Sequence, residues 1–423
     1  MKQERYERGQ ALIMVAVAAV VLFGFAALAI DGSRKFSDRR HAQNAADAAA
    51  MAAALASSRG SDDASSQTKA VAVTTLNGYD GGASSDITVT ITASPAGVCP
   101  PDTEGKDIQV DIVSTIGTTF ARVIHWNQLT NNVSATAREC GSFIGPPFNG
   151  NAVVSLARQG RGFDGTGTPD WLITGGGIFA NSADGDAAYC NGAAGITAPS
   201  VTVAGQTQFR CHGTSDYGTV TENADQYTGR MIQALLPRQP ACDGRATLSG
   251  GQWHPQSGAD GSQVQFDNQD DMNFAPGLYC VTNSGRFVVH GTISGLEITF
   301  YIMQSDFQMA FAGGGNLTAR APTSDTNEYK GVLIYAAPQF DASGNLIQTQ
   351  SIDLRGNGSD NITGTIIVPS ADVTMFGNST SANFDSQIIA YHVDSGGNAN
   401  IDIRYKINHN YQAALPISLT LLK

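Results

Sequence analysis

A run of twenty uncharged, almost entirely apolar residues from Ala11 to Ile30 constrains the fold of this chain more than any other segment. A helix rises about 1.5 Å per residue, so twenty residues are enough to cross the hydrocarbon core of a bilayer. A cleaved secretory signal has a shorter apolar core and ends in a small-residue cleavage site. Here the helical pattern continues through Asp31. We therefore expect an uncleaved membrane anchor.

The segment that follows, residues 39–56, is more than half alanine. Alanine is the strongest helix former, and residues 1–94 contain no proline. The sequence therefore predicts one helix over residues 10–56, roughly 70 Å long. Its outer part, residues 31–56, would form a stalk. Small residues let another backbone approach closely, so this stalk either offers a surface to a partner or packs on its own domain.

Close packing of the stalk predicts that one side tolerates bulk less than the other. Ala49 and Ala53 lie four residues apart and share a helix face. We place Ala46 and Ala50 on the opposite face as the more tolerant pair. Leucine at both Ala49 and Ala53 should therefore impair assembly of the protein with whatever packs against the stalk. Because the sequence does not identify the inward face, the prediction is an asymmetry between the pairs.

Six cysteines are spread over the chain after the apolar run, and none forms a C-x-x-C pair that would indicate a zinc knuckle or a thioredoxin-type motif. They are Cys99, Cys140, Cys190, Cys211, Cys242 and Cys280. An even number at wide spacing is typical of disulfides in an oxidising compartment. Six cysteines can pair in about fifteen ways, and pairing of sequence neighbours keeps each bridge within one predicted region. Six buried free thiols are the alternative.

The orientation in the membrane depends on these cysteines. Basic residues flank both ends of the apolar run, so the positive-inside rule does not decide the topology. Disulfides require an oxidising compartment, which places the C-terminal body outside the cytoplasm and the N-terminus inside. The net charge of −12 argues against a nucleic-acid partner, which needs a basic surface.

Three motifs occur together near the N-terminus: an R-G-Q-A opening, an A-x-x-I-D-G-x-R exit from the apolar run, and an A-Q-N-A-A-D-A-A-A-x-A helix. In combination they resemble the TadG-like N-terminal domain of Flp (Tad) pilus-assembly proteins. The residues that carry this resemblance are Arg8, Gly9, Asp31, Gly32, Arg39, Gln43, Asn44, Ala45, Asp47 and Ala48, to which Ala49 and Ala53 add helix-packing positions.

The resemblance implies a single-pass inner-membrane protein with its body outside, whose partners are components of the Tad/Flp pilus-assembly system. Some relatives carry a von Willebrand A domain with a D-x-S-x-S metal site. Here Asp31-Gly-Ser33 and Asp63-Ala-Ser65 both lack the second serine, so no metal and no cofactor are expected. Gly9 is also a candidate end of a prepilin-type leader, although Met14 stands where such leaders have glutamate.

The pattern of residues 58–142 predicts a small α+β module. This module is similar to the corresponding part of TadE/TadG-type proteins. Residues 86–92 and 107–113 alternate apolar and polar side chains, as half-buried strands do. Helices are predicted at 68–76 and 118–126, and a last strand at 131–140. Residues 143–270 are glycine-rich and give little signal, so we expect an irregular region.

Residues 271–423 contain many short apolar strands separated by Gly, Asn, Ser or Pro. This pattern favours a β-solenoid, of the right-handed β-helix type, over a β-sandwich. It also resembles the β-helical region of some TadG-like proteins. The predicted fold class is therefore α+β and mainly β, with residues 1–57 as cytoplasmic tip, membrane helix and stalk.

β-Helices often act on polysaccharides, so we considered catalytic and metal sites. Asp164 and Asp170 lie in a glycine-rich loop without the further oxygen ligands of a calcium site, which favours a surface turn. Other acidic and basic candidates do not form a recognisable motif, and G-x-S-x-G, H-E-x-x-H and P-loop patterns are absent from the sequence. These candidates are Asp267, Asp270, Asp271, His290, Arg404 and Lys406.

We therefore expect a non-enzymatic, membrane-anchored protein of Tad/Flp pilus assembly, with its body in the periplasm or outside the cell. Cell-wall or surface polysaccharide and self-assembly are further expected interactions. Two alternatives stand beside this interpretation. One is a filament subunit packed through its N-terminal helix. The other is a membrane-tethered β-helix that binds or cleaves carbohydrate.

Overall fold

The computed structural model describes residues 7–100, 103–213, 215–266, 271–283, 285–289, 291–311, 316–356, 361–377, 382–397, 400–415 and 417–422. The chain divides into two compact units. We call Met1–Phe143 with Pro416–Lys423 the helix unit, and Ile144–Leu415 the solenoid unit. The helix unit is thus formed by both ends of the chain, and the solenoid unit is inserted between them.

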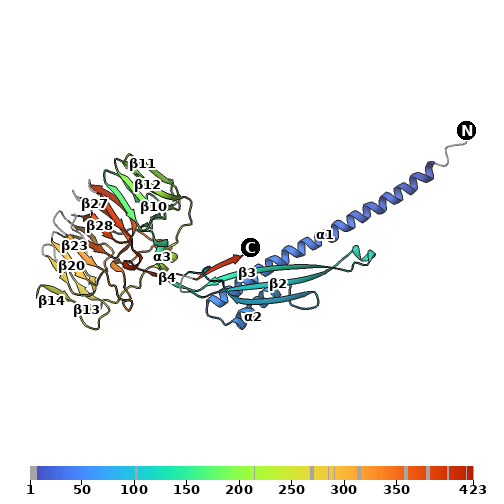
Figure 1. The fold of residues 1–423 in the computed structure, drawn as a ribbon, viewed down its shortest axis with the longest axis horizontal. Coiled ribbons are helices and arrows are strands. Elements are labelled where there is room, and N and C mark those ends of the chain that lie inside the picture. The colour runs from blue at the N-terminus through green and yellow to red at the C-terminus, as the bar shows by residue number, and fades with distance from the viewer. Residues whose placement is uncertain are drawn as a thin grey trace. The chain divides into compact units, whose positions relative to one another are not determined.

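The helix unit begins with one uninterrupted helix, α1 (Glu7–Ser58), as the sequence predicts. Large apolar side chains between Leu12 and Ile30 are 44–76% exposed. This part of α1 extends past the strands of its own unit (Figure 1). Within the described part of the chain, α1 is the one helix whose length and composition suit a membrane crossing.

A four-stranded antiparallel sheet and a second helix complete this unit. The sheet order is β1-β2-β3-β32, with β2 paired to β1 and β3 along their full lengths. The elements are α2 (Asp63–Leu76), β1 (Ser85–Ala93), β2 (Gly105–Gly117), β3 (Gln128–Cys140) and β32 (Ser418–Leu422). The predicted helix at 118–126 forms only the short 3-10 helix η1 (Ala121–Ile124), because β2 and β3 pair up to Gly117 and Gln128 and leave little chain for the connection.

Strand β32 corrects the predicted domain boundaries. The sequence assigned residues 271–423 to the solenoid, but Thr136 and Cys140 of β3 pair with Leu422 and Ser418 of β32. Leu419 and Leu421 pack against the alanine-rich core of the helix unit, so this strand is retained by apolar burial. The boundary after residue 57 is also not a domain boundary, because α1 contributes its alanine face to the same core.

The solenoid unit stacks its coils through parallel strands, which agrees with the predicted β-solenoid and differs from the antiparallel sheets of a sandwich. The strands form three rows. The first row is β16 (Ser262–Val264), β18 (Gly277–Val281), β21 (Ile298–Ile302), β24 (Val332–Ala336), β27 (Thr365–Gly377), β29 (Ile388–Gly397), β5 (Val153–Ser155), β8 (Ile178–Ala180), β10 (Gly195–Val203) and β12 (Asp216–Thr221).

The other two rows share the same coils. The second row is β19 (Arg286–Val289), β22 (Gln308–Phe311), β25 (Gln350–Gly356), the later parts of β27 and β29, β6 (Phe163–Asp164), β9 (Ala188–Gly192) and β11 (Thr207–Cys211). The third row is β15 (Gln252–His254), β17 (Met272–Phe274), β20 (Thr292–Leu296), β23 (Asn316–Arg320), β26 (Asn361–Thr363), β28 (Ala382–Asp385), β30 (Ile401–Arg404), β7 (Asp170–Thr174) and the start of β10. Shorter elements are β4 (Phe143–Gly145) paired with β31 (Ala413–Leu415), β13 (Gly244–Arg245), β14 (Thr247–Ser249), η2 (Pro147–Gly150) and η3 (Ile407–His409).

The coil of the solenoid that comes first in the sequence lies in the middle of the coil stack. The first coil, β5 to β7, pairs on one side with β8 and β10 and on the other with β29 and β30, the last coil to be synthesised. The expectation of an irregular region at 143–270 is therefore wrong. Its strands escaped prediction because most are short and many of their buried residues are small, including Ala187, Ala188, Cys190, Ala194 and Ala198.

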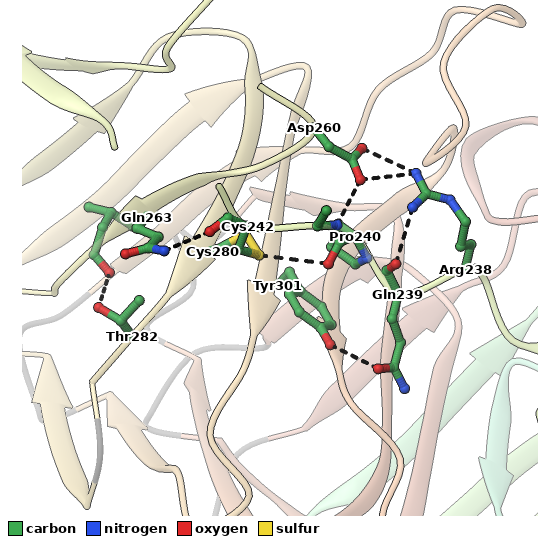
Figure 2. Close-up of a disulfide and its surroundings, with 11 residues drawn as sticks. Arg238, Gln239, Pro240, Cys242, Asp260, Gln263, Cys280, Thr282 and Tyr301 are labelled. Atoms are coloured by element: carbon green, nitrogen blue, oxygen red, sulfur yellow. Dashed lines mark hydrogen bonds and ion pairs between the residues drawn. A yellow bond between two sulfur atoms is a disulfide. The ribbon is translucent and has the colours of Figure 1, made fainter. Parts of the chain in front are cut away.

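Residues 222–243 connect β12 at one end of the coil stack to β13 at the other, and we call them the strap. The strap contains α3 (Gly229–Leu235), whose Ile232 and Leu235 are buried against the outer face of the first row. Near its end Arg238 bonds to Asp260 at 3.1 Å, and Cys242 forms a disulfide with Cys280 (Figure 2). The strap thus covers an apolar face that would otherwise meet water.

All six cysteines form disulfides in the neighbour connectivity: Cys99–Cys140, Cys190–Cys211 and Cys242–Cys280. The first bridge lies in the helix unit and the other two in the solenoid unit. The alternative of six free thiols is therefore wrong.

Candidate functional site

The candidate site is the face of α1 that follows the apolar run, and Asp31 is its first member. One carboxylate oxygen of Asp31 accepts the N–H of Thr119 at 2.8 Å, and the other accepts those of Phe120 and Ala121 at 3.0 and 2.7 Å. These donors lie at the start of η1, where a helix leaves N–H groups unpaired. The three hydrogen bonds lower the pKa of Asp31, whose side chain is 3% exposed. Asp31 therefore fastens the β2–β3 connection to α1.

A second carboxylate, Asp38, fastens α1 to the sheet and to the segment after α2. It accepts hydrogen bonds from the Ser114 hydroxyl at 2.8 Å, the Asn131 amide at 2.6 Å and the Tyr79 hydroxyl at 3.1 Å. Burial, together with the charge of Asp38, raises the pKa of Tyr79. The sequence analysis missed Asp38. Its spacing of seven residues from Asp31 places both on one helix face, and this spacing could have identified it.

Gln43 provides the third polar contact of this face. Its amide donates to Asp47 on α1 at 2.8 Å and to the backbone oxygen of Ser134 on β3 at 3.0 Å. Farther along α1, the hydroxyl of Ser57 donates to the buried Glu139 at 2.9 Å. The polar residues of α1 thus bond to the sheet and to the β2–β3 connection, from the end of the apolar run to the C-terminus of the helix.

The alanine face packs between these polar contacts. Ala42, Ala45, Ala46, Ala49, Ala50, Ala53 and Ala54 are at most 1% exposed, and they form one core with the apolar side chains of α2, β2 and β3. The interpretation that the stalk packs on its own domain is therefore the one the structure supports. The assignment of Ala46 and Ala50 to an opposite, tolerant face is wrong, because residues three and four apart form a single broad face.

Other motif residues do not contribute to this face. Arg39, Asn44 and Ala48 are exposed on α1, and nothing lies within 4 Å of the position a side chain would take at Gly32. Arg8 and Gly9 lie in the first turns of α1, where the structure describes the backbone alone. Their predicted roles in assembly stay predictions.

The catalytic candidates of the solenoid that the structure describes each bond to a different partner or lie in different rows. Asp271 accepts the Thr292 N–H at 2.5 Å, while Arg404 and Lys406 bond to Asp402 and Asp385 at 2.6 and 2.7 Å. Asp267, Asp270 and His290 lie outside the described residues. Asp164 and Asp170 lie on β6 and β7, in different rows. Among the side chains that the structure describes, no group of three or more His, Cys, Asp or Glu could hold a metal ion.

A different group of titratable side chains lies along the second row of strands. Asp372 and His392 are register partners joined at 2.7 Å, and Asp394 is the register partner of Asp164. Burial, with the negative charge of Asp164 as the next cause, raises the pKa of Asp394 to about 6. Arg161 bonds to Asp164 at 3.1 Å. Sequence analysis did not find this group because its members come from three separate strands.

The contacts on α1 are hydrogen bonds and close packing, which fix the position of a helix. Residues 9–56 match a family model described as "Putative Flp pilus-assembly TadE/G-like". Comparisons with curated proteins and with solved structures found no match. The matched segment lies within α1 and contains Asp31, Asp38, Gln43 and the alanine face.

Proposed function

We propose, from the match of residues 9–56 to the TadE/G-like Flp pilus-assembly family model, that the chain is a non-enzymatic, membrane-anchored assembly protein of a Tad/Flp-type pilus with its body outside the cytoplasm. One observation carries the proposal. The family-matched segment contains both the apolar run and the polar and alanine residues that fix α1 to the helix unit. The anchor and its folded support are therefore one structural element.

The disulfides support a body outside the cytoplasm. Each bridge lies after the apolar run, in an oxidised form that reducing cytoplasm does not maintain. Protein extracted from native membranes should contain six cysteines that react with an alkylating agent only after reduction. Six thiols that react without reduction would contradict the outside orientation.

In this proposal α1 holds the helix unit at the membrane, and the solenoid unit presents a rigid surface whose apolar face is covered by the strap. Pilus-assembly components are the proposed partners, and cell-wall or surface polysaccharide is a proposed ligand of the solenoid. The helix unit cannot turn freely about its anchor, because Asp31 and Asp38 tie the sheet to α1. Force or position at the membrane would therefore be transmitted to the sheet.

The test is complementation of a host strain that lacks this gene. We expect loss of Flp pili in the deletion strain, recovery with the wild-type chain, and co-purification of the chain with Tad components. Asp31→Ala should reduce recovery at equal membrane levels, because three backbone donors lose their acceptor. Arg40→Ala is the matched control, because Arg40 is exposed on α1 and does not belong to the family motif. Normal piliation of the deletion strain would overturn the proposal.

A second function, a filament subunit packed through α1, is favoured by one observation. Every large apolar side chain from Leu12 to Ile30 is exposed within the helix unit, so a neighbouring copy could cover this surface as well as lipid could. Processing after Gly9 would begin the mature chain close to this segment. Mass measurement of the native N-terminus and electron microscopy of the purified protein decide between the two. A chain processed at Gly9 and found in filaments would favour the subunit role.

A further inference from the structure

The connection between β2 and β3, residues 118–127, exposes a group of large apolar side chains. Phe120, Val123 and Trp126 are 43%, 83% and 66% exposed. Soluble surfaces seldom gather such residues in one short loop without a binding partner. We call residues 118–127 the interface loop.

Hydrogen bonds place the interface loop beside the end of the apolar run. Asp31, the residue directly after Ile30, accepts the N–H groups of Thr119, Phe120 and Ala121. One turn along α1, Arg34 donates to the Thr119 hydroxyl at 2.6 Å. If residues 11–30 cross the bilayer, as the proposed function states, the loop lies at the depth of the lipid headgroups.

The side chains around the loop suit that depth. Tryptophan is enriched at membrane–water interfaces, and arginine and lysine there approach lipid phosphates. Trp126 lies in the loop with Arg122, and the exposed Arg34 and Lys35 follow the apolar run on α1. Phe36, 71% exposed, adds a further apolar side chain to the same level of the helix.

Most backbone N–H groups of the interface loop have a hydrogen-bond acceptor within the protein. This pairing matters near a bilayer, because an N–H group without an acceptor is costly where water is scarce. Asp31 satisfies three of the loop's donors. Within the loop, the N–H of Thr118 donates to Asn127 at 3.0 Å, that of Val123 to Phe120 at 3.0 Å, and that of Trp126 to Ala121 at 3.1 Å.

We propose that the interface loop inserts Phe120, Val123 and Trp126 into the headgroup region of the bilayer that α1 crosses, with Arg34 and Arg122 at the lipid phosphates. The helix unit is then attached to the membrane at two points, α1 and the loop. This second attachment fixes the tilt and rotation of the unit over the bilayer. The inference rests on the proposed membrane anchor, and its test separates the two.

The test uses the full chain in vesicles of phosphatidylcholine and phosphatidylglycerol that contain lipid brominated near the headgroup end of its acyl chains. Bromine quenches only tryptophans that reach this depth. The chain has three tryptophans, and Trp171 is buried in the solenoid at 1% exposure. We expect quenching in the wild type, and we expect Trp126→Phe to remove most of it. Equal quenching in both proteins would overturn the proposal.

Two variants extend the test to the apolar contact itself. Val123→Asp should reduce the quenching of Trp126 severalfold, because a carboxylate at the loop tip disfavours insertion. Val98→Asp is the matched control, since Val98 is 45% exposed in the connection between β1 and β2. Equal loss of quenching in the two variants would also overturn the proposal.

Flotation of the same vesicles separates this inference from the proposed function. Protein that floats with the vesicles is anchored, so an unquenched Trp126 in that protein overturns the interface loop and leaves the anchor intact. Protein that does not float contradicts the anchor, and the loop proposal falls with it.

Discussion

The helix unit and the solenoid unit are stabilised by different kinds of packing. In the helix unit, a helix of small residues lies close to an antiparallel sheet, and carboxylates on that helix bond to the sheet. In the solenoid unit, parallel coils stack over a core rich in large side chains, such as Phe163 against Trp171 with ring centroids 5.1 Å apart. The helix unit depends on close approach at a few positions, whereas the solenoid distributes its stability over many coils.

Larger side chains on the alanine face should cause the largest loss of stability. Leucine at both Ala49 and Ala53, or at both Ala46 and Ala50, should destabilise the helix unit by about 2–6 kcal/mol, because overpacking costs about 1–3 kcal/mol per site. Thermal unfolding and protease sensitivity measure the loss. Leucine at the exposed Asn44 and Ala48 is the control and should change stability little. A tolerated pair among the four buried alanines would restore the asymmetry predicted from the sequence.

Removal of a disulfide should cause the next largest loss of stability. It also tests whether the two units unfold independently. Cys99–Cys140 and Cys242–Cys280 span 41 and 38 residues, so loop entropy predicts nearly equal losses of about 4 kcal/mol when either bridge is replaced by two alanines. Calorimetry of each variant should show one transition lowered and the other unchanged. If both variants lower the same transition, the two units form one cooperative structure and the comparison fails.

The two units should respond to pH with opposite signs. The pKa of Asp31 is lowered in the folded helix unit, so its contribution is present near neutral pH and is lost as the pH falls below about 4. The pKa of Asp394 is raised to about 6, so the folded solenoid binds this proton more tightly than the unfolded chain. Stability of the solenoid from this group therefore falls as the pH rises from about 4 to about 6, and stays lower above it.

Asp394→Asn isolates that effect. After allowance for solvent screening, we expect the variant to gain about 1–2 kcal/mol at pH 7 and to lose the slope between pH 4 and 6. Chemical unfolding at a series of pH values measures both quantities. An unchanged slope in the variant would show that Asp394 is not the responsible group.

Exposed ion pairs give the smallest effect in both units. Lys106 and Asp63 of the helix unit are 38% and 55% exposed, and Lys330 and Asp325 of the solenoid are 34% and 90% exposed. Lys106→Met and Lys330→Met should each change the free energy of unfolding by less than about 1 kcal/mol. A larger loss in one unit would identify a surface charge network that matters there.

Sequence patterns found the features of this fold that are local. The unbroken α1, the alternating strands β1 and β2, and the apolar strands after residue 271 all follow from periodicity over neighbouring residues. The family motif identified Asp31 and Gln43, although the partners of Asp31 lie in the β2–β3 connection and one partner of Gln43 lies on β3. Local patterns therefore identified the elements and part of the candidate site.

The missed features depend on contacts between residues far apart in the chain. Ser155 donates to the backbone oxygen of Tyr391, 236 residues later, and β32 pairs with a strand that ends at Cys140. Such pairings leave no period in the sequence around either partner. The group around Asp394 was missed for the same reason, because its members lie on separate strands.

The entry of the chain into the middle of the solenoid has a consequence for secretion. A chain exported from its N-terminal side first delivers the coil β5 to β7, and with it a sheet edge that only β29 and β30 can cover. More than two hundred residues separate that edge from its cover, as the bond from Ser155 to Tyr391 shows. With the body outside the cytoplasm, as we propose, the solenoid cannot finish folding until its last coil has crossed the membrane. Until then an open sheet edge is a target for chaperones and for misassembly with other secreted chains.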